Sequence, residues 1–269
     1  METKQINHEV FINAAAHDVF EALMDARRHT EMTGEAAQID RKPGGAFTTY
    51  GGHVSGKTIE SVPDRKLVQD WRASDWKPGY HSRVSISLEP VNEGGGTQLS
   101  LEHAGVPAEH VKEISDGWRS YYWSKLPAYL RKRQVAAVRL FLEEFKNHSN
   151  LDIVDTTWTK DCQLHVPGMT LPQGWAAQKQ VGAMIFAAFG DVHVEVNQTI
   201  VEGDRVVERH TATAVHKGEF LGLKATGKRI HWTENHIYRI EDGLIAEAWS
   251  EVSFHDVIAQ ISSASHAAA

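Results

Sequence analysis

The stretch HIYRIEDGLIAEAW, residues 236–249, decides how the second half of the chain folds. Apolar and polar residues alternate on either side of Asp242 and Gly243, as expected of two half-buried strands. An Asp-Gly pair between two alternating runs is typical of a tight hairpin turn. A two-residue turn would set these residues opposite each other: Ile240 and Ile245, Tyr238 and Glu247, His236 and Trp249, Glu234 and Glu251, and Trp232 and Ser253.

This pairing places six residues on one face of the hairpin: Trp232, Glu234, His236, Trp249, Glu251 and Ser253. If that face lines a pocket, the opposed carboxyl groups of Glu234 and Glu251 repel each other, and one has a raised pKa suited to general acid or base catalysis. Glu251 is the predicted base and Glu234 its partner. Two alternatives stay open. A three-residue turn with a bulge would shift the register by one residue, or the glutamates lie on the wet side of the sheet or pair with Arg209.

Two histidines complete the predicted catalytic set. His165 and His236 can each donate a hydrogen bond to an oxyanion or orient a carboxylate, although a single histidine can equally be a hydrogen-bonded structural residue. The segment SFHDVIAQI, residues 253–261, predicts a helix with Ser253 as its N-cap and Asp256 as a capping-box acid. The residues expected to contact a ligand are Trp249, Ser253, Trp232, Tyr238 and Arg209, with Trp118 and Tyr122 in the first half.

The sequence as a whole indicates two α+β domains, residues 1–134 and 135–269. In the second, helices are expected at 135–147 and 174–190, followed by strands at 191–201, 205–216, 229–240 and 244–253. In the first, the expected order is a strand at 8–13, a helix at 15–25, repeated strands within 44–103 and a long helix at about 109–133. That order predicts a curved antiparallel sheet that holds one C-terminal helix and encloses a cavity.

Composition and charge exclude several classes of function. The chain has 269 residues with a net charge of −7, and its longest basic run is RKR at 131–133, so no nucleic-acid partner is expected. No window approaches the roughly 18 apolar residues of a membrane span, and the N-terminus lacks a signal-peptide core, so we expect a cytoplasmic protein. The single cysteine, Cys162, excludes an intramolecular disulfide. No expected element carries a metal-binding histidine spacing, so neither a metal nor another cofactor is expected.

Four stretches of the first half resemble the AHSA1-type branch of the SRPBCC superfamily: FINAAAHDVFEALMD, PGGAFTTYGGHVSGKTIESVPDRKLVQDWRASDW, TQLSLEHAGVP and DGWRSYYWSKLPAYL. The resemblance implies the helix-grip fold of START-like proteins, with a pocket for a small hydrophobic molecule. Eukaryotic relatives assist the ATPase of the ninety-kilodalton heat-shock chaperone and carry a separate N-terminal chaperone-binding domain. That domain has no counterpart in this sequence, so a chaperone partner is not expected.

Three stretches of the second half are similar to the SnoaL-like polyketide cyclases: VRLFLEEFKNHSNLDIVDTTWTKDCQLHVPG, EGDRVVERHTATAVHKGEFLGLKATGKRI and HIYRIEDGLIAEAW. The resemblance implies a cone-shaped α+β domain of the nuclear-transport-factor-two-like class, acid/base chemistry beside a carbonyl group, and a homodimer through this domain. Ring-closing relatives carry an Asp four residues after the Trp of the last strand. Ser253 stands at that position here, so their mechanism cannot be copied onto this chain.

The sequence therefore predicts a pocket enzyme of cyclase, isomerase or hydrolase type that acts on a small hydrophobic carbonyl compound. Its acid/base set would centre on Glu251, His165 and His236. Two alternatives from other classes remain: a non-catalytic pair of ligand-binding modules, and a co-chaperone-like adaptor.

Overall fold

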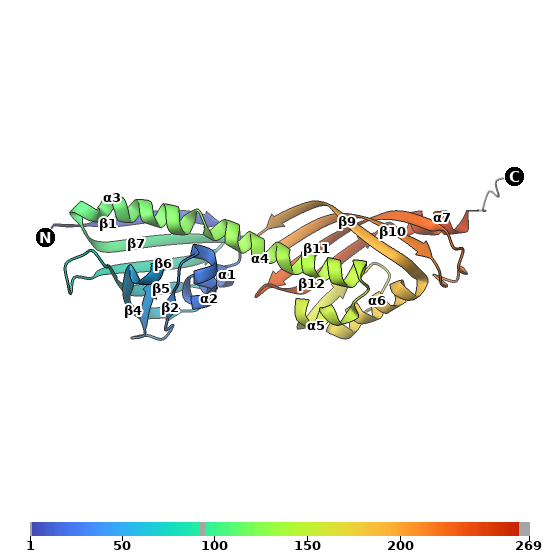
Figure 1. The fold of residues 1–269 in the computed structure, drawn as a ribbon, viewed down its shortest axis with the longest axis horizontal. Coiled ribbons are helices and arrows are strands. Elements are labelled where there is room, and N and C mark those ends of the chain that lie inside the picture. Colours follow the sequence, from blue (N-terminus) through green and yellow to red (C-terminus); the bar gives the residue numbers. More distant parts are fainter. Residues whose placement is uncertain (1, 92–94, 264–269) are drawn as a thin grey trace. The chain divides into compact units, whose positions relative to one another are not determined.

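The structure is a computed structural model, which describes residues 2–91 and 95–263. The chain divides into two compact units. One comprises the residues up to Lys132 together with 202–204, and the other comprises 133–201 and the residues from 205 onward. Each unit combines helices with one sheet, so the expected α+β class is confirmed (Figure 1).

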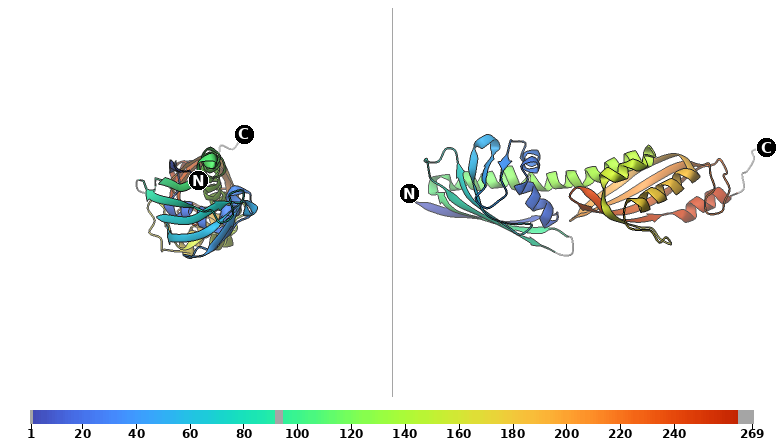
Figure 2. Two further views of the ribbon diagram at one scale, coloured as in Figure 1. Left: turned by 90° about the vertical axis from the view of Figure 1, so that its left-hand side faces the viewer. Right: turned by 90° about the horizontal axis from the view of Figure 1, so that it is seen from below.

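The first unit is built on a seven-stranded antiparallel sheet in the order β1-β7-β6-β5-β4-β3-β2. Its strands are β1 Thr3–Ile12, β2 Gln38–Ile39, β3 Ala46–Thr49, β4 Val54–Val62, β5 Lys66–Ala73, β6 Ser82–Pro90 and β7 Thr97–Pro107. Its helices are α1 Ala16–Met24, α2 Ala26–Thr33, η1 Tyr50–Gly52, η2 Ala108–His110, α3 Val111–Gly117, the π-helical turn η3 Trp118–Trp123, and the start of α4 Leu126–Phe141. Figure 2 shows this sheet curving beside the helical stretch that follows β7.

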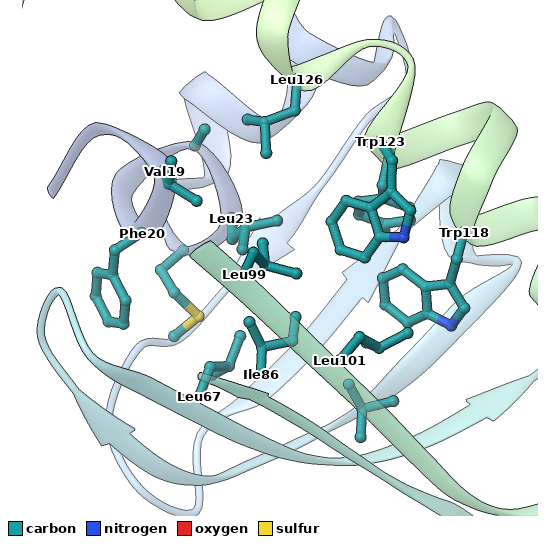
Figure 3. Packing of buried hydrophobic residues seen from close by; sticks show 14 of the residues in the cluster. Val19, Phe20, Leu23, Leu67, Ile86, Leu99, Leu101, Trp118, Trp123 and Leu126 are labelled. Carbon is teal, nitrogen blue, oxygen red and sulfur yellow. The ribbon is translucent and has the colours of Figure 1, made fainter. Parts of the chain in front are cut away.

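Alternation along the central strands builds the core of the first unit. In β6, Val84, Ile86 and Leu88 alternate with Arg83, Ser85 and Ser87 in the sequence, which predicts one buried face, and all three apolar side chains are buried. Trp118 and Trp123 extend from the helical stretch into the same core, with their rings stacked at 5.5 Å between centroids (Figure 3). Apolar burial on both sides therefore holds the helical stretch on the sheet.

Directional hydrogen bonds fix the protonation of the core histidine His103. Trp118 Nε1 can only donate, so His103 Nδ1 accepts from it at 3.1 Å. The ring proton then lies on Nε2, which donates to Ser82 Oγ at 2.7 Å. Burial lowers the pKa of His103 to about 3. His103 is therefore neutral near pH 7 and links β7 to the helical stretch.

The second unit is built on a five-stranded sheet in the order β8-β12-β11-β10-β9, in which β8 runs parallel to β12. Its strands are β8 Trp158–His165, β9 Phe189–Glu202, β10 Arg205–His216, β11 Arg229–Glu241 and β12 Leu244–Val252. Its helices after α4 are the π-helical turn η4 Leu142–Asn147, η5 Leu151–Ile153, α5 Val154–Thr157, α6 Trp175–Ala188 and α7 Phe254–Ser262. The four predicted strands are confirmed, whereas β8 was not predicted.

Residues 126–141 form one continuous helix, where the sequence predicted two helices separated near residue 134. Residues 128–147 contain neither glycine nor proline, so nothing in the local sequence ends the helix at that point. Among the described helices, none is long and apolar enough to cross a membrane.

The hairpin between β11 and β12 begins as predicted. Asp242 and Gly243 both have positive φ angles, 55° and 78°, as a two-residue turn of this hand requires. Ile240 pairs with Ile245, which confirms the first predicted pair.

A β-bulge then shifts the rest of the hairpin. Arg239 pairs with Glu247, so Ala246 is an extra residue on β12 without a partner on β11. The pairs beyond the bulge are Tyr238 with Ala248, Ile237 with Trp249, His236 with Ser250, Asn235 with Glu251 and Glu234 with Val252. The predicted partners of Tyr238, His236 and Glu234 are therefore wrong by one residue. The shift has the size of the alternative register, but it comes from a bulge at Ala246 after a two-residue turn and not from a three-residue turn.

Candidate active site

A cavity inside the second unit encloses about 100 Å³. Its walls are mostly apolar and come from α4, η4, α6, α7 and the strands of the sheet. The polar side chains in the wall include Lys146, Gln178, Glu234, His236 and Ser250. An apolar cavity with a few convergent polar groups is typical of a small-molecule site.

Strand β11 supplies the centre of the site. Glu234, His236 and Tyr238 alternate with exposed or half-buried residues, so all three are buried on the same side of the sheet. Ser250 lies directly across from His236 on β12 as a result of the bulge. Lys146 comes from η4, about ninety positions earlier in the chain. Three separate elements thus bring these polar groups together.

Hydrogen bonds join Ser250, His236 and Glu234 into one chain. His236 Nδ1 lies 2.9 Å from Ser250 Oγ, and His236 Nε2 lies 2.7 Å from Glu234 Oε2. Because an ionised carboxylate can only accept, Nε2 carries the ring proton and Nδ1 accepts from the serine hydroxyl. Glu234 Oε1 accepts from Trp232 Nε1 at 2.7 Å, and Lys146 Nζ is ion-paired with Glu234 Oε2.

A positive charge lies beside Glu234 instead of a second carboxylate. Burial by itself raises the pKa of Glu234, but the Lys146 ammonium and the neighbouring imidazoles outweigh burial and hold that pKa well below its usual range. The expectation of a raised pKa is therefore wrong for Glu234. Burial, with the nearby Lys146 charge, lowers the pKa of His236 to about 4. Near pH 7 the site thus holds an ionised Glu234, a neutral His236 and a cationic Lys146.

A second buried carboxylate–histidine pair lies beside the first. His210 Nε2 lies 3.2 Å from Glu208 Oε2, and Arg139 Nε lies 3.1 Å from Glu208 Oε1. His210 Nδ1 lies 3.8 Å from Glu234 Oε2, and the His210 and His236 rings are 4.9 Å apart between centroids. Each of the two buried carboxylates, Glu208 and Glu234, thus forms an ion pair with a basic side chain, which offsets part of the free-energy cost of burying a charge.

The bulge directs the other predicted residues to the opposite face of β12. Glu251 is exposed there, and Trp249 stacks on His165 with ring centroids 5.2 Å apart. His165 Nε2 lies 2.8 Å from Glu247 Oε1 on the same face. The predicted opposition of Glu251 and Glu234 is therefore wrong, and Glu251 has the wet-face position that was left open as an alternative. The predicted catalytic set is divided, with one part in the cavity and the other outside it.

The predicted ligand-contact residues also lie in different places. Trp232 and Tyr238 line the cavity, whereas Arg209 is exposed on β10 across from Asn235. Ser253 Oγ lies 3.2 Å from Thr233 Oγ1. Ser253 occupies the N-cap position of α7, but its side chain makes no capping hydrogen bond, so the predicted side-chain cap is wrong. In the first unit, Trp118 and Tyr122 line a groove of about 460 Å³.

Comparisons with known proteins assign a family to each half of the chain. Residues 13–131 match the family described as Activator of Hsp90 ATPase homolog 1-like protein, and residues 136–261 match the SnoaL-like polyketide cyclases. The chain joins an AHSA1 domain to a SnoaL-like domain. Both resemblances seen in the sequence are thereby confirmed.

Individual relatives cover parts of the chain. The Activator of 90 kDa heat shock protein ATPase homolog 1 of Homo sapiens is 33% identical over 101 residues, which are 38% of this chain and 28% of that protein. This chain thus spans less than a third of that relative. A solved HSP90 activator from Plasmodium falciparum is 25% identical with a TM-score of 0.44, covering 49% of this chain and 97% of its own. TsrD from Streptomyces laurentii is 23% identical with a TM-score of 0.45, covering 49% and 96%.

Three side chains of the SnoaL-like domain have the composition of a metal site. His210, Glu234 and His236 bring ligand-type atoms within 4.8 Å of one another. However, the Lys146 ammonium is ion-paired with Glu234 and already supplies the positive charge that this carboxylate needs. A metal ion bound by these three side chains would therefore have to displace the Lys146 ammonium from Glu234.

Four residues of this site were missed by the sequence analysis. Ser250 was hidden by the bulge, which moves it from the outer to the inner side of β12. Lys146 lies in the highly charged segment EEFKN, which has the composition of a solvated helix face. Glu208 and His210 lie on the buried side of β10 together with Val206 and Ala212, and exposed or half-buried residues alternate with these four. That alternation is a usable signal, because a carboxylate and an imidazole in an otherwise apolar register indicate a buried polar pair.

Proposed function

We propose that the SnoaL-like domain is an acid/base enzyme that moves a proton at a carbon next to the carbonyl group of a small, largely apolar compound. The observation that carries this proposal is the hydrogen-bonded chain Ser250–His236–Glu234, with Lys146 beside it, in the wall of an apolar cavity. Deprotonation beside a carbonyl needs a base in a dry pocket and a donor for the developing oxyanion. The cavity offers both.

In the proposed mechanism, the substrate gives its proton to Ser250 Oγ while the serine hydroxyl gives its own proton to His236 Nδ1. The C–H electron pair becomes the enolate, and the negative charge on its oxygen is stabilised by the Lys146 ammonium. As Lys146 turns from Glu234 to the enolate, Glu234 loses its counter-cation and stabilises the new His236 imidazolium instead. This exchange of partners strengthens the base at the moment at which the substrate proton leaves. Reprotonation at another atom, or attack of the enolate carbon on a second carbonyl, then gives isomerase or cyclase chemistry.

The test is hydrogen exchange on a small ketone. Wild-type protein in D₂O should exchange the α-hydrogens of cyclopentanone for deuterium faster than buffer alone, as followed by NMR. Because Glu251 is exposed outside the cavity, the variant Glu251→Gln should exchange at a rate within about twofold of wild type. If Glu251→Gln no longer catalysed the exchange, the base would be on the outer face of the sheet and not in the cavity. If cyclopentanone raised the melting temperature but no hydrogen exchange were detected, the domain would be a ligand-binding module and not an enzyme.

A second candidate function concerns the AHSA1 domain. The human relative that is 33% identical over 101 residues is named an activator of the 90 kDa heat shock protein ATPase, so we also propose that this domain contacts a chaperone of that class, contrary to the expectation from the sequence. The full chain should then raise the steady-state ATPase rate of a purified 90 kDa heat shock protein. A rate that stays flat up to a severalfold molar excess of the chain would remove this candidate.

A further inference from the structure

A groove in the AHSA1 domain is lined mainly by aromatic rings. It has a volume of about 460 Å³, and residues of η1, β4, β5, α3 and η3 form its wall. The aromatic residues of this wall are Tyr50, Trp71, Trp118, Tyr121 and Tyr122. Tyr121 is 55% exposed, so the groove is open to solvent at this ring. A molecule in solution can therefore reach the aromatic wall.

Three of these rings, Tyr50, Tyr121 and Tyr122, are set at steep angles and form a tyrosine box. The centroid of the Tyr50 ring lies 5.7 Å from that of Tyr121 and 5.6 Å from that of Tyr122, with angles of 60° and 68° between the ring planes. Tyr50 Oη donates to the Tyr121 carbonyl oxygen at 3.0 Å, which holds two sides of the box together. Rings arranged at such angles can turn their faces toward one guest from different sides, as in the aromatic cages that bind organic cations.

A carboxylate lies next to the tyrosine box. Burial, the neighbouring Tyr122 and Tyr121 and the negative charge of Glu35 all raise the pKa of Tyr50, so the Glu35 side chain acts on this ring at close range. Glu35 is exposed on the rim of the groove. Within residues 2–91 and 95–263, its carboxylate has neither a hydrogen bond nor an ion pair. The rim therefore offers a negative charge without a counter-cation.

The basic residue of the wall, Lys125, is already engaged. Its Nζ donates to the Thr33 carbonyl oxygen at 2.6 Å and lies 5.9 Å from the centroid of the Tyr121 ring. The fold thus already places one ammonium group within cation–π distance of the tyrosine box. With His53 neutral, the carboxylates of Glu35 and Glu113 and the single ammonium of Lys125 give the lining residues a net charge of −1. The wall as a whole therefore attracts a further cation.

We propose that this groove of the AHSA1 domain binds a small organic cation of the alkylated ammonium type. The alkyl groups pack on the aromatic rings, and the positive charge is attracted both by the ring faces and by Glu35. An anion would be repelled by the net negative charge, and an uncharged hydrocarbon would leave Glu35 without a counter-ion. This ligand class differs from the hydrophobic molecule that the family resemblance implies, and the proposal does not depend on the acid/base function proposed for the SnoaL-like domain.

The test is the binding of choline and of 3,3-dimethyl-1-butanol, measured by calorimetry on the full chain at constant ionic strength. The alcohol has the shape of choline but carries a carbon atom in place of the charged nitrogen. Choline should bind more tightly than the alcohol by about 2- to 30-fold, the range expected of a cation held by aromatic rings. Tyr121→Leu removes one ring of the box but keeps the backbone carbonyl that Tyr50 bonds, and Glu35→Gln removes the rim charge. Each variant should reduce the preference for choline.

Two matched controls make the same exchanges outside the groove. Phe11 on β1 is 54% exposed and Glu89 on β6 is exposed, so Phe11→Leu and Glu89→Gln should leave the preference for choline unchanged. Because Tyr121 and Glu35 are exposed as well, their variants should fold like the wild type. The proposal is overturned if choline and the alcohol bind equally, if neither binds, or if the wild-type preference survives in either groove variant. Since neither turnover nor a chaperone is involved, this result is independent of the tests of both proposed functions.

Discussion

Replacing Lys146 with methionine should lower the free energy of unfolding of the SnoaL-like domain by about 3–5 kcal/mol. The side chain of Glu234 is 6% exposed, and its ion pair with Lys146 is what keeps it ionised there. Methionine keeps most of the apolar stem of lysine but removes the charge, so the carboxylate is left buried without a cation. Urea denaturation of the full chain, followed by tryptophan fluorescence, measures the loss.

Two further variants show whether the loss comes from the unpaired carboxylate. Adding Glu234→Gln to Lys146→Met removes the stranded charge, so the double variant should regain most of the lost stability. Lys179 pairs with Asp155 at 2.7 Å, but the two side chains are 31% and 40% exposed, so Lys179→Met should cost less than about 1 kcal/mol. If the double variant were as unstable as the sum of the two single variants, the ion pair would not be the cause.

Replacing His236 with asparagine should lower kcat/KM for ketone exchange by about 10²- to 10⁴-fold, the usual contribution of a general base. Asparagine can still bond with Ser250 or Glu234, but it cannot take up a proton. NMR exchange rates over a range of ketone concentrations give the value. The matched control is His165→Asn on the outer face of the sheet, where the imidazole stacks on Trp249; its kcat/KM should stay within about twofold of wild type. Equal losses in both variants would point to a structural effect.

The pH dependence of the wild-type rate should report the same residue. The neutral form of His236 is the base, and its pKa is lowered to about 4, so kcat/KM should be flat near neutral pH and fall as the pH drops through about 4. Because this pKa lies below that of histidine in the unfolded chain, the unfolded state binds more protons between the two values and the domain loses stability as the pH falls through that window. The folded fraction must therefore be measured at each pH. A rate that fell already near pH 6.5 would contradict a buried base.

Much of the fold follows from local patterns in the sequence. Alternation alone places Val84, Ile86 and Leu88 in the core of the AHSA1 domain, and the Asp242–Gly243 turn is set by two residues that tolerate positive φ angles. These features depend on neighbours in sequence, so the sequence carries them. Strand β8 is different, because its parallel pairing with β12 is made only in the folded sheet.

The candidate site could be predicted only in part. His236 and Glu234 were found because the hairpin pattern places them on one face of the strand, and both are buried on that face together with Trp232 and Tyr238. Lys146, the ion-pair partner of Glu234, was not predicted. It lies on a helical turn far from Glu234 in the sequence, and no sequence pattern links the two residues. The error over Glu251 has another origin, since its position depends on one residue inserted into a regular strand.

The bulge at Ala246 changes the phase of β12. Before it, the odd-numbered Ile245 is buried; after it, the even-numbered Ala248, Ser250 and Val252 line the cavity. If the alternation of side chains along β12 is counted forward from the turn, a residue beyond the bulge is therefore assigned to one side of the sheet; if it is counted backward from α7, the same residue is assigned to the other side. When a sequence that shares this hairpin is aligned with this one, a single gap at Ala246 therefore determines which residues of the strand are assigned to the cavity and which to the surface.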